Sequence, residues 1–198
     1  MWKKAEEKLL KDKYVGPLVN KWGHCAIKPR IHTDYFQGLV GEIIGQQLSG
    51  KVAGVIYKRL KLKIRGILTV NKILFLPDDE LRNCGMAWSK VRAIKDLTLK
   101  IKEKKLHIRK LNELSDEIVE KELTNVKGIG PWTAQMFLMF TLGRADIFPT
   151  NDLGIKKGFE KVTGKKWDKI KSVKFAEKQW KPYRTVASWY LWRSLEKI

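Results

Sequence analysis

The chain has 198 residues, of which 43% are hydrophobic and 31% are charged. A chain of this length can bury a core without help from disulfides or metal ions. Its apolar stretches are all much shorter than the roughly 20 residues of a membrane-spanning helix, so a membrane protein is not expected. Its two cysteines are too few for a disulfide framework or a four-thiolate iron–sulfur cluster.

The charge balance indicates the class of partner. The 41 Lys and Arg residues against 21 Asp and Glu give a formal net charge of +20 at pH 7, which attracts a polyanion over a long range. Nucleic acid is the first candidate, and a basic surface that serves solubility alone is the alternative. The segment from Met1 to Asp12 lacks the apolar run of a secretion signal, so we expect a cytoplasmic, nucleoid-associated protein.

Apolar residues recur at helical spacing along the chain. The first such helix is expected from Tyr35 to about Leu48, and Ser49 can cap a second one. The stretch from Leu60 to Gly66 alternates like a strand, but no later segment offers it a partner, so we interpret it as a helix end.

Candidate N-cap residues mark further helices between residues 78 and 115. Asp78 and Asp79 are cap candidates for a short helix that stops near Gly85, and Ser89 can open the next one. Ser115 precedes an acidic first turn, which the helix dipole favours. With no repeat or linker, the sequence predicts one all-α domain over residues 1–198.

The segment LTNVKGIGPWTA, Leu123 to Ala134, joins two helices by a tight turn. Gly128 and Gly130 permit positive φ and close backbone approach, and Pro131 suits the first turn of the next helix, whose free amides can hold a phosphate oxygen. A plain packing corner would also use glycine. The longer pattern resembles the DNA-binding helix-hairpin-helix motif at 115–142, carried by Leu123, Val126, Gly128, Ile129, Gly130, Thr133 and Ala134.

The resemblance implies that Gly128, Gly130 and Thr133 meet the phosphate backbone, with Lys127 in support. In that family the hairpin carbonyls can also hold a monovalent cation. No other cofactor and no metal site are expected.

After the hairpin, GRADIFPTNDLGIKKGF places Asp152 at a helix start, where an ordinary helix cap is the alternative interpretation. The segment resembles the helix-hairpin-helix, Gly/Pro-rich, aspartate (HhH-GPD) superfamily of DNA glycosylases, in which Asp152 matches the catalytic aspartate. An ionised carboxylate there would stabilise the cationic sugar and orient a water. Asp146 and Asn151 are interpreted as structural residues that bond the loop backbone. Members that also cut the strand carry Lys two residues after the second hairpin glycine, where this chain has Trp132, so the resemblance implies a monofunctional enzyme.

The segment GEIIGQQLSGKVAGVIYKRL resembles the 3-methyladenine DNA glycosylase II branch, in which a loop residue fills the gap that a flipped base leaves. Gln47 is the best candidate for this wedge, with Gln46 and Leu48 beside it. Bacterial members place an apolar residue there, so Gln47 is a departure. A loop without DNA contact is the alternative.

The segment WKPYRTVASWYLW resembles the closing helix of the same branch, with Trp192 as a base-pocket aromatic. Trp132 matches another pocket position and Met136 a third, although core packing could explain each of them. The match covers about Tyr35 to Trp192, and we expect the two-lobe helical core without an N-terminal β domain.

Together these patterns predict a monomeric glycosylase for alkylated purines, 3-methyladenine and 7-methylguanine, in duplex DNA. Two alternatives stay open: a glycosylase for uracil, hypoxanthine or mismatched bases, and a noncatalytic DNA-binding protein with the same hairpin. An iron–sulfur glycosylase is disfavoured by the missing cysteines.

Overall fold

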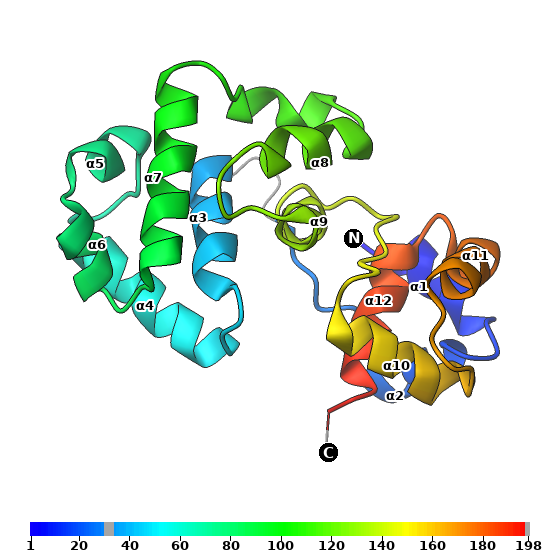
Figure 1. Ribbon diagram of the computed structural model, residues 1–198. Coiled ribbons are helices and arrows are strands. Elements are labelled where there is room, and N and C mark those ends of the chain that lie inside the picture. Colours follow the sequence, from blue (N-terminus) through cyan, green and yellow to red (C-terminus); the bar gives the residue numbers. More distant parts are fainter. Residues whose placement is uncertain (30–33, 197–198) are drawn as a thin grey trace. The chain divides into compact units, whose positions relative to one another are not determined.

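The computed structural model describes residues 1–29 and 34–196, in which helices are joined by turns and loops and no strand occurs (Figure 1). The predicted all-α class is therefore confirmed. The chain forms two compact units: the first combines residues 1–29 with the chain from Gly143 onward, and the second ends at Leu142. That residues 1–198 make one domain stays a prediction. Within the described ranges, no helix is long and apolar enough to cross a membrane.

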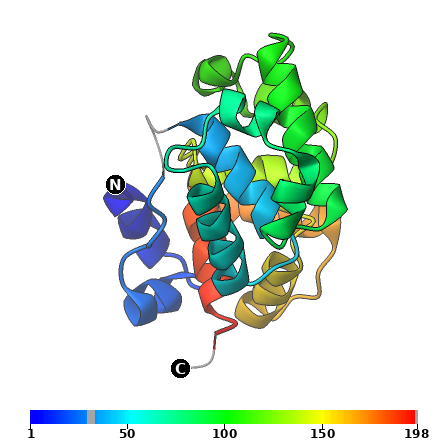
Figure 2. The ribbon, with the colours of Figure 1, turned by 90° about the vertical axis from the view of Figure 1, so that its left-hand side faces the viewer.

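The first unit is built around its last helix, α12. Its helices are α1 (Lys3–Leu10), α2 (Gly16–Trp22), α10 (Leu153–Thr163), α11 (Lys169–Trp180) and α12 (Arg184–Arg193). Helix α12 packs against α1, α2, α10 and α11, and Figure 2 shows it between the two N-terminal helices and α10.

Aromatic side chains fill the core of the first unit. Phe159, Phe175 and Trp180 meet edge to face, with ring centroids 5.5–6.1 Å apart. Gly158 lets α10 lie against α12, because a Cβ at this position would be 2.5 Å from the carbonyl oxygen of Leu191. The two helices are therefore held at a fixed, close distance.

The second unit is centred on α3 and α7. Its helices are α3 (Tyr35–Gly45), α4 (Gly50–Lys63), α5 (Val70–Phe75), α6 (Asp78–Asn83), α7 (Trp88–Lys102), the 3₁₀ helix η1 (Ile108–Glu113), α8 (Asp116–Thr124) and α9 (Pro131–Phe140). Helices α5 and α6 pack on α7, whereas α9 packs on α3 and pairs with α8. In Figure 1 the two groups lie on opposite sides of α7.

Helix starts agree with the sequence analysis at some positions and differ at others. The hydroxyls of Ser49 and Ser115 accept hydrogen bonds from the amides three residues later, as caps do. Helix α6 instead has Pro77 at its N-cap, so Asp78 lies inside its first turn, and α7 begins one residue before Ser89. Both cap predictions were therefore wrong: the N-cap lies one residue before Asp78 at α6 and two residues before Ser89 at α7. An acid inside the first turn also suits the helix dipole, so the acids of α6 do not by themselves mark the cap.

Candidate functional site

Asp152 is the N-cap residue of α10 in the first unit. Its Oδ1 accepts a hydrogen bond of 2.8 Å from the Ile155 amide, and its own amide donates to the Pro149 carbonyl at 3.0 Å. The preceding loop therefore turns into the helix at this carboxylate, and the side chain is half-buried. The predicted helix-start position of Asp152 is confirmed by this geometry.

A second donor reaches the same oxygen. Trp192 Nε1, from α12, donates to Asp152 Oδ1 at 2.8 Å. Gly154 makes this contact possible: a Cβ there would lie 2.7 Å from Trp192 Cδ1 and 3.0 Å from Asp152 Oδ1. One backbone amide and one indole thus fix the orientation of the carboxylate. Sequence reasoning assigned Trp192 to a base pocket and missed this hydrogen bond.

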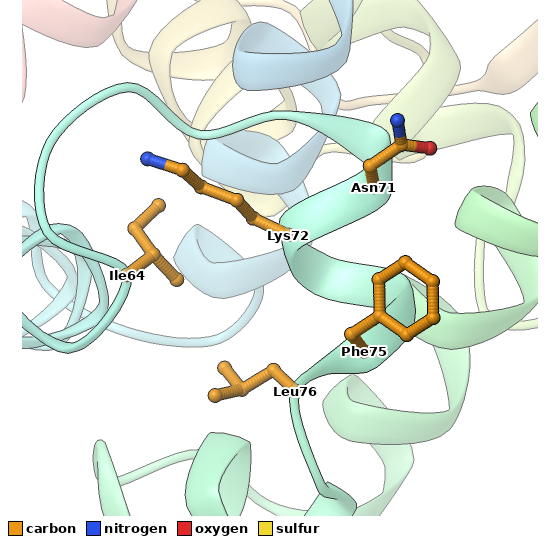
Figure 3. Close-up of a pocket in the computed structure, with 5 residues that line it drawn as sticks. All are labelled: Ile64, Asn71, Lys72, Phe75 and Leu76. Atoms are coloured by element: carbon orange, nitrogen blue, oxygen red, sulfur yellow. The ribbon is translucent and has the colours of Figure 1, made fainter.

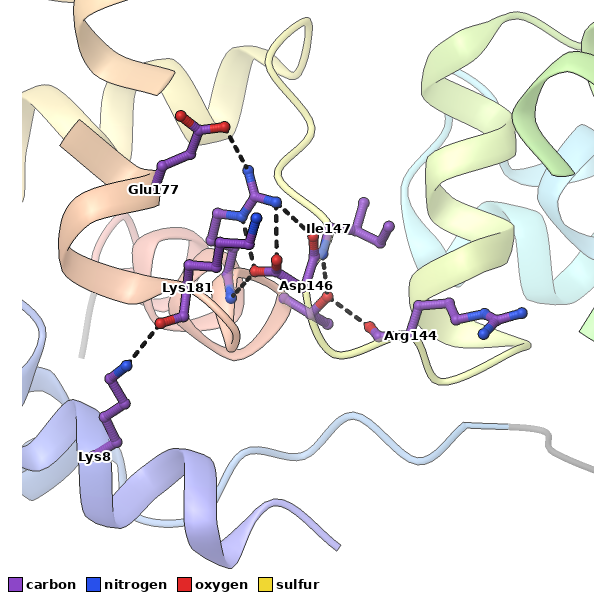
Figure 4. A network of polar contacts seen from close by, with 8 residues as sticks. Lys8, Arg144, Asp146, Ile147, Glu177 and Lys181 are labelled. Atoms are coloured by element: carbon purple, nitrogen blue, oxygen red, sulfur yellow. Dashed lines mark hydrogen bonds and ion pairs between the residues drawn. The ribbon is translucent and has the colours of Figure 1, made fainter. Parts of the chain in front are cut away.

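The loop that leads to Asp152 is fastened to the N-terminus of α12 (Figure 4). Arg184 Nε and Nη2 donate to the two carboxylate oxygens of Asp146 at 2.8 and 2.9 Å, a bidentate pair. The buried Thr185 hydroxyl donates to the Arg144 carbonyl at 2.7 Å and accepts from the Ile147 amide at 3.0 Å. Asp146 is structural, as expected from the sequence, but its main partner is a side chain.

These contacts give α12 a role at both of its ends. Its first residues hold the loop at 144–147, and Trp192 near its last turn holds Asp152. Because a helix is a stiff element, the carboxylate is placed by a single rigid support rather than by the loop alone.

The hairpin lies in the second unit, between α8 and α9. Gly128 has a φ of 78°, and a Cβ there would be 2.8 Å from Ala93 Cβ on α7, so both its conformation and its position require glycine. Gly130 differs: its φ is −94° and nothing lies within 4 Å of a Cβ built on it. Positive φ, which the sequence analysis allows at both glycines, therefore occurs at Gly128 and not at Gly130.

A carboxylate on α7 accepts a hydrogen bond from the backbone of the hairpin turn. Asp96 Oδ2 accepts from the Lys127 amide at 2.8 Å and from Lys100 Nζ at 2.5 Å. Burial raises the pKa of the Asp96 carboxyl, but these hydrogen bonds outweigh it and hold the pKa below its usual value. The Lys127 side chain is exposed, as a phosphate contact requires.

The loop after α3 contains the predicted wedge residues. Gln46 turns its side chain toward the hairpin, where Nε2 donates to the Gly128 carbonyl at 2.8 Å and to Thr133 Oγ1 at 2.9 Å. Gln47 has a φ of 56° and is exposed, and Leu48 is also exposed. Of the three predicted wedge residues, Gln47 and Leu48 are therefore exposed and Gln46 is half-buried.

A buried lysine closes the end of α3. Lys90 Nζ, from α7, donates to the Ile44 carbonyl at 2.8 Å and to the Gln46 carbonyl at 2.9 Å. Burial lowers the pKa of the Lys90 ammonium. Its positive charge also suits the negative end of the helix dipole. The sequence carried no signal for this lysine, which is one of 41 basic residues.

The remaining predicted site residues lie on α9. Thr133 and Met136 are buried, with 3% and 4% of their surface exposed, and Trp132 is half-buried. The structure thus gathers Asp152 and Trp192 in the first unit. It gathers Gln46, Gly128 and Thr133 in the second.

Other cavities and donor groups do not coincide with these residues. A surface pocket of about 360 Å³ is lined by Ile64, Asn71, Lys72, Phe75 and Leu76 (Figure 3), none of which was predicted to act. The ranges that the structure describes contain no cluster of His, Cys, Asp and Glu able to hold a metal ion. Cys25 and Cys84 are buried free thiols.

The monovalent cation suggested for the hairpin would have to share oxygens that already accept hydrogen bonds. The carbonyl of Leu123 accepts from the Val126 amide, and that of Val126 accepts from the Ile129 amide. The Gly128 carbonyl accepts from Gln46 Nε2. Each carbonyl has a second lone pair that could bind a cation, so the cation site stays a prediction.

A helix-hairpin-helix with a glycine turn, together with an aspartate that caps a helix after a proline-containing loop, defines the class of helical base-excision glycosylases. The sequence model described as "HhH-GPD superfamily base excision DNA repair protein" matches residues 40–183, and the chain belongs to this family.

The chain is similar to several known proteins. It is 33% identical to a DNA-3-methyladenine glycosylase of Saccharomyces cerevisiae over 83% of its own length and 68% of the yeast protein. It is 28% identical to an alkylbase DNA glycosidase-like protein of Schizosaccharomyces pombe, over 97% and 93% of the two chains. Among solved structures, the 3-methyladenine DNA glycosylase of S. pombe in complex with abasic DNA has a TM-score of 0.80 at 30% identity, with 96% of each chain covered.

Proposed function

We propose that this protein is a monofunctional DNA glycosylase that hydrolyses the N-glycosidic bond of alkylated purines in duplex DNA. The observation that carries the proposal is the Asp152 carboxylate, held by the Ile155 amide and the Trp192 indole at the start of α10. Membership of the HhH-GPD family and relatives named for 3-methyladenine support the same activity.

The chemistry follows from the charge that develops on the sugar. As the bond between C1′ and the base nitrogen breaks, its electron pair leaves with the base and C1′ becomes cationic. A carboxylate held in place stabilises that cation and orients the water that attacks C1′. Trp132 stands where an attacking lysine would be, so water is the nucleophile and the product is an intact abasic strand.

An alkylated purine suits a site with little acid catalysis. Alkylation at N3 or N7 places a positive charge on the ring, which weakens the glycosidic bond without a proton donor. An indole face attracts such a ring by about 0.5 to 2 kcal/mol, and Trp192 is the aromatic beside Asp152. We therefore expect 3-methyladenine and 7-methylguanine to be released faster than hypoxanthine or uracil.

The net charge of +20 and the hairpin support duplex DNA as the partner. We propose that the protein acts as a monomer and, in the cell, works beside the chromosome. Binding should weaken steeply with salt, because each neutralised phosphate contributes a log–log slope of about −0.9.

The test is release of free base from methylated duplex DNA by the wild type and by Asp152→Asn. The variant should release no base, yet bind an abasic duplex about as tightly as the wild type, because the hairpin is untouched. Borohydride trapping of a covalent protein–DNA adduct would contradict the hydrolytic mechanism. Equal single-turnover rates for uracil and 3-methyladenine would favour a glycosylase for neutral bases, and binding without any base release would favour a noncatalytic protein.

A further inference from the structure

Gln46 connects two loops that lie far apart in sequence. Its side-chain amide donates to the Gly128 carbonyl at 2.8 Å and to Thr133 Oγ1 at 2.9 Å, across separations of 82 and 87 residues. One partner belongs to the hairpin turn and the other to the first turn of α9. Both protons of the Gln46 amide group can therefore be used within the second unit.

The backbone of Gln46 is held as firmly as its side chain. Lys90 Nζ donates to the Gln46 carbonyl at 2.9 Å and to the Ile44 carbonyl at 2.8 Å. The next residue, Gln47, has a φ of 56° and an exposed side chain. The chain thus changes direction at Gln47, immediately after a residue whose side chain and backbone carbonyl are both hydrogen-bonded.

The hairpin turn is braced from a second direction. The Lys127 amide donates to Asp96 Oδ2 at 2.8 Å, and Gly128 lies so close to Ala93 that a Cβ would come within 2.8 Å of it. Both supports come from α7, the helix that also carries Lys90. The hairpin turn and the Gln46–Leu48 loop are consequently both held by contacts with α7.

We infer that Gln46 is a positioning residue rather than a wedge: its amide joins the hairpin and the loop into one rigid element. On this inference, which rests on the proposed function, phosphate binding at the hairpin sets where Gln47 and Leu48 enter the duplex. Gln46 also holds the hairpin turn in the shape that presents its amides to a phosphate.

The test compares Gln46→Met with Gln47→Met, which remove an amide from adjacent residues and leave side chains of similar length. The salt dependence of binding to an undamaged duplex reports the hairpin contact, and 2-aminopurine fluorescence in the duplex reports base flipping. Gln46→Met should lower the magnitude of the log–log salt slope by about 0.9, the loss of one phosphate contact. Gln47→Met should keep the wild-type slope, because the hydrogen bonds to the hairpin belong to Gln46. It should also keep the fluorescence change, because a long apolar side chain can fill the gap, whereas Gln46→Met should reduce that change by misplacing the loop.

A double-mutant cycle on affinity separates the two roles further. Gln46→Met and Thr133→Val remove the same hydrogen bond, so the affinity loss of the double variant should be smaller than the product of the two single losses. The losses of Gln47→Met and Thr133→Val should multiply, because these residues share no such bond. A wild-type salt slope for Gln46→Met, or multiplication with Thr133→Val, would overturn the inference.

If Gln46→Met does not fold by circular dichroism, Gln46→Glu and Gln47→Glu provide a second pair. They add the same charge one residue apart, but only the first sets a carboxylate against the Gly128 carbonyl, so its slope should fall further. Equal slopes would contradict the inference. A wild-type protein that releases no base would instead refute the proposed function, whatever the slopes are.

Discussion

Gly154 is the position where one added methyl group tests the geometry around Asp152. In Gly154→Ala the new Cβ would lie 2.7 Å from Trp192 Cδ1, about 0.7 Å short of an ordinary 3.4 Å contact. The same Cβ would lie 3.0 Å from Asp152 Oδ1. A shift of this size is enough to break the 2.8 Å hydrogen bond between the indole and the carboxylate.

The expected effect is on the rate of base release. A hydrogen bond to a charged group contributes about 1.5 to 3 kcal/mol, which corresponds to a rate loss of about 10- to 160-fold when the bond orients the carboxylate in the transition state. Alanine is also favoured over glycine in a helix by up to about 1 kcal/mol, so unfolding alone is not expected to explain the loss.

The assay is single-turnover release of 3-methyladenine, together with affinity for an abasic duplex and the melting temperature. Gly54→Ala on α4 is the matched control, since nothing lies within 4 Å of a Cβ there. It should match or exceed the wild-type melting temperature and keep the wild-type rate. If Gly154→Ala also releases base at the wild-type rate, the contact with Trp192 does not position Asp152.

Three further changes test other parts of the structure. Trp192→Phe keeps a ring but removes the indole N–H, so base release should fall by about 10-fold or more, and an unchanged single-turnover rate would count against the hydrogen bond. Gly130→Asp has open space in the fold and should leave the melting temperature near the wild-type value, but it should weaken duplex binding by repelling phosphate, as a titration at fixed salt can check. Asp96→Asn should destabilise the protein near neutral pH, because a carboxyl whose pKa is lowered by folding stabilises the native state above its unfolded pKa of about 4. This difference in unfolding free energy should shrink as the pH falls below about 4, and a constant difference would contradict the role of Asp96.

Local sequence patterns were sufficient wherever the cause is local. Ser49, Ser115 and Asp152 were recognised as caps because the amide that each side chain accepts from is three residues away. The hairpin was found for the same reason, since its glycines and apolar residues lie within one short segment. The helices α1, α2, α5 and α11 were not assigned. Of these, α1, α2 and α5 have 8, 7 and 6 residues, too few for a periodic pattern to stand out.

The sequence by itself determined the all-helical class, the hairpin, the position of Asp152 and, through resemblance, the family. Only the tertiary structure decided what these residues touch. Gln46 donates a hydrogen bond to the hairpin 82 residues away, and Trp192 donates one to Asp152 40 residues away. The residue type of a glutamine or a tryptophan does not indicate which distant residue it will contact. The sequence also does not show which glycines are required. A neighbouring helix leaves no room for a Cβ at Gly128 and Gly154, whereas a Cβ at Gly130 would meet open space. Such contacts depend on how distant helices pack, and that packing leaves no local periodicity in the chain.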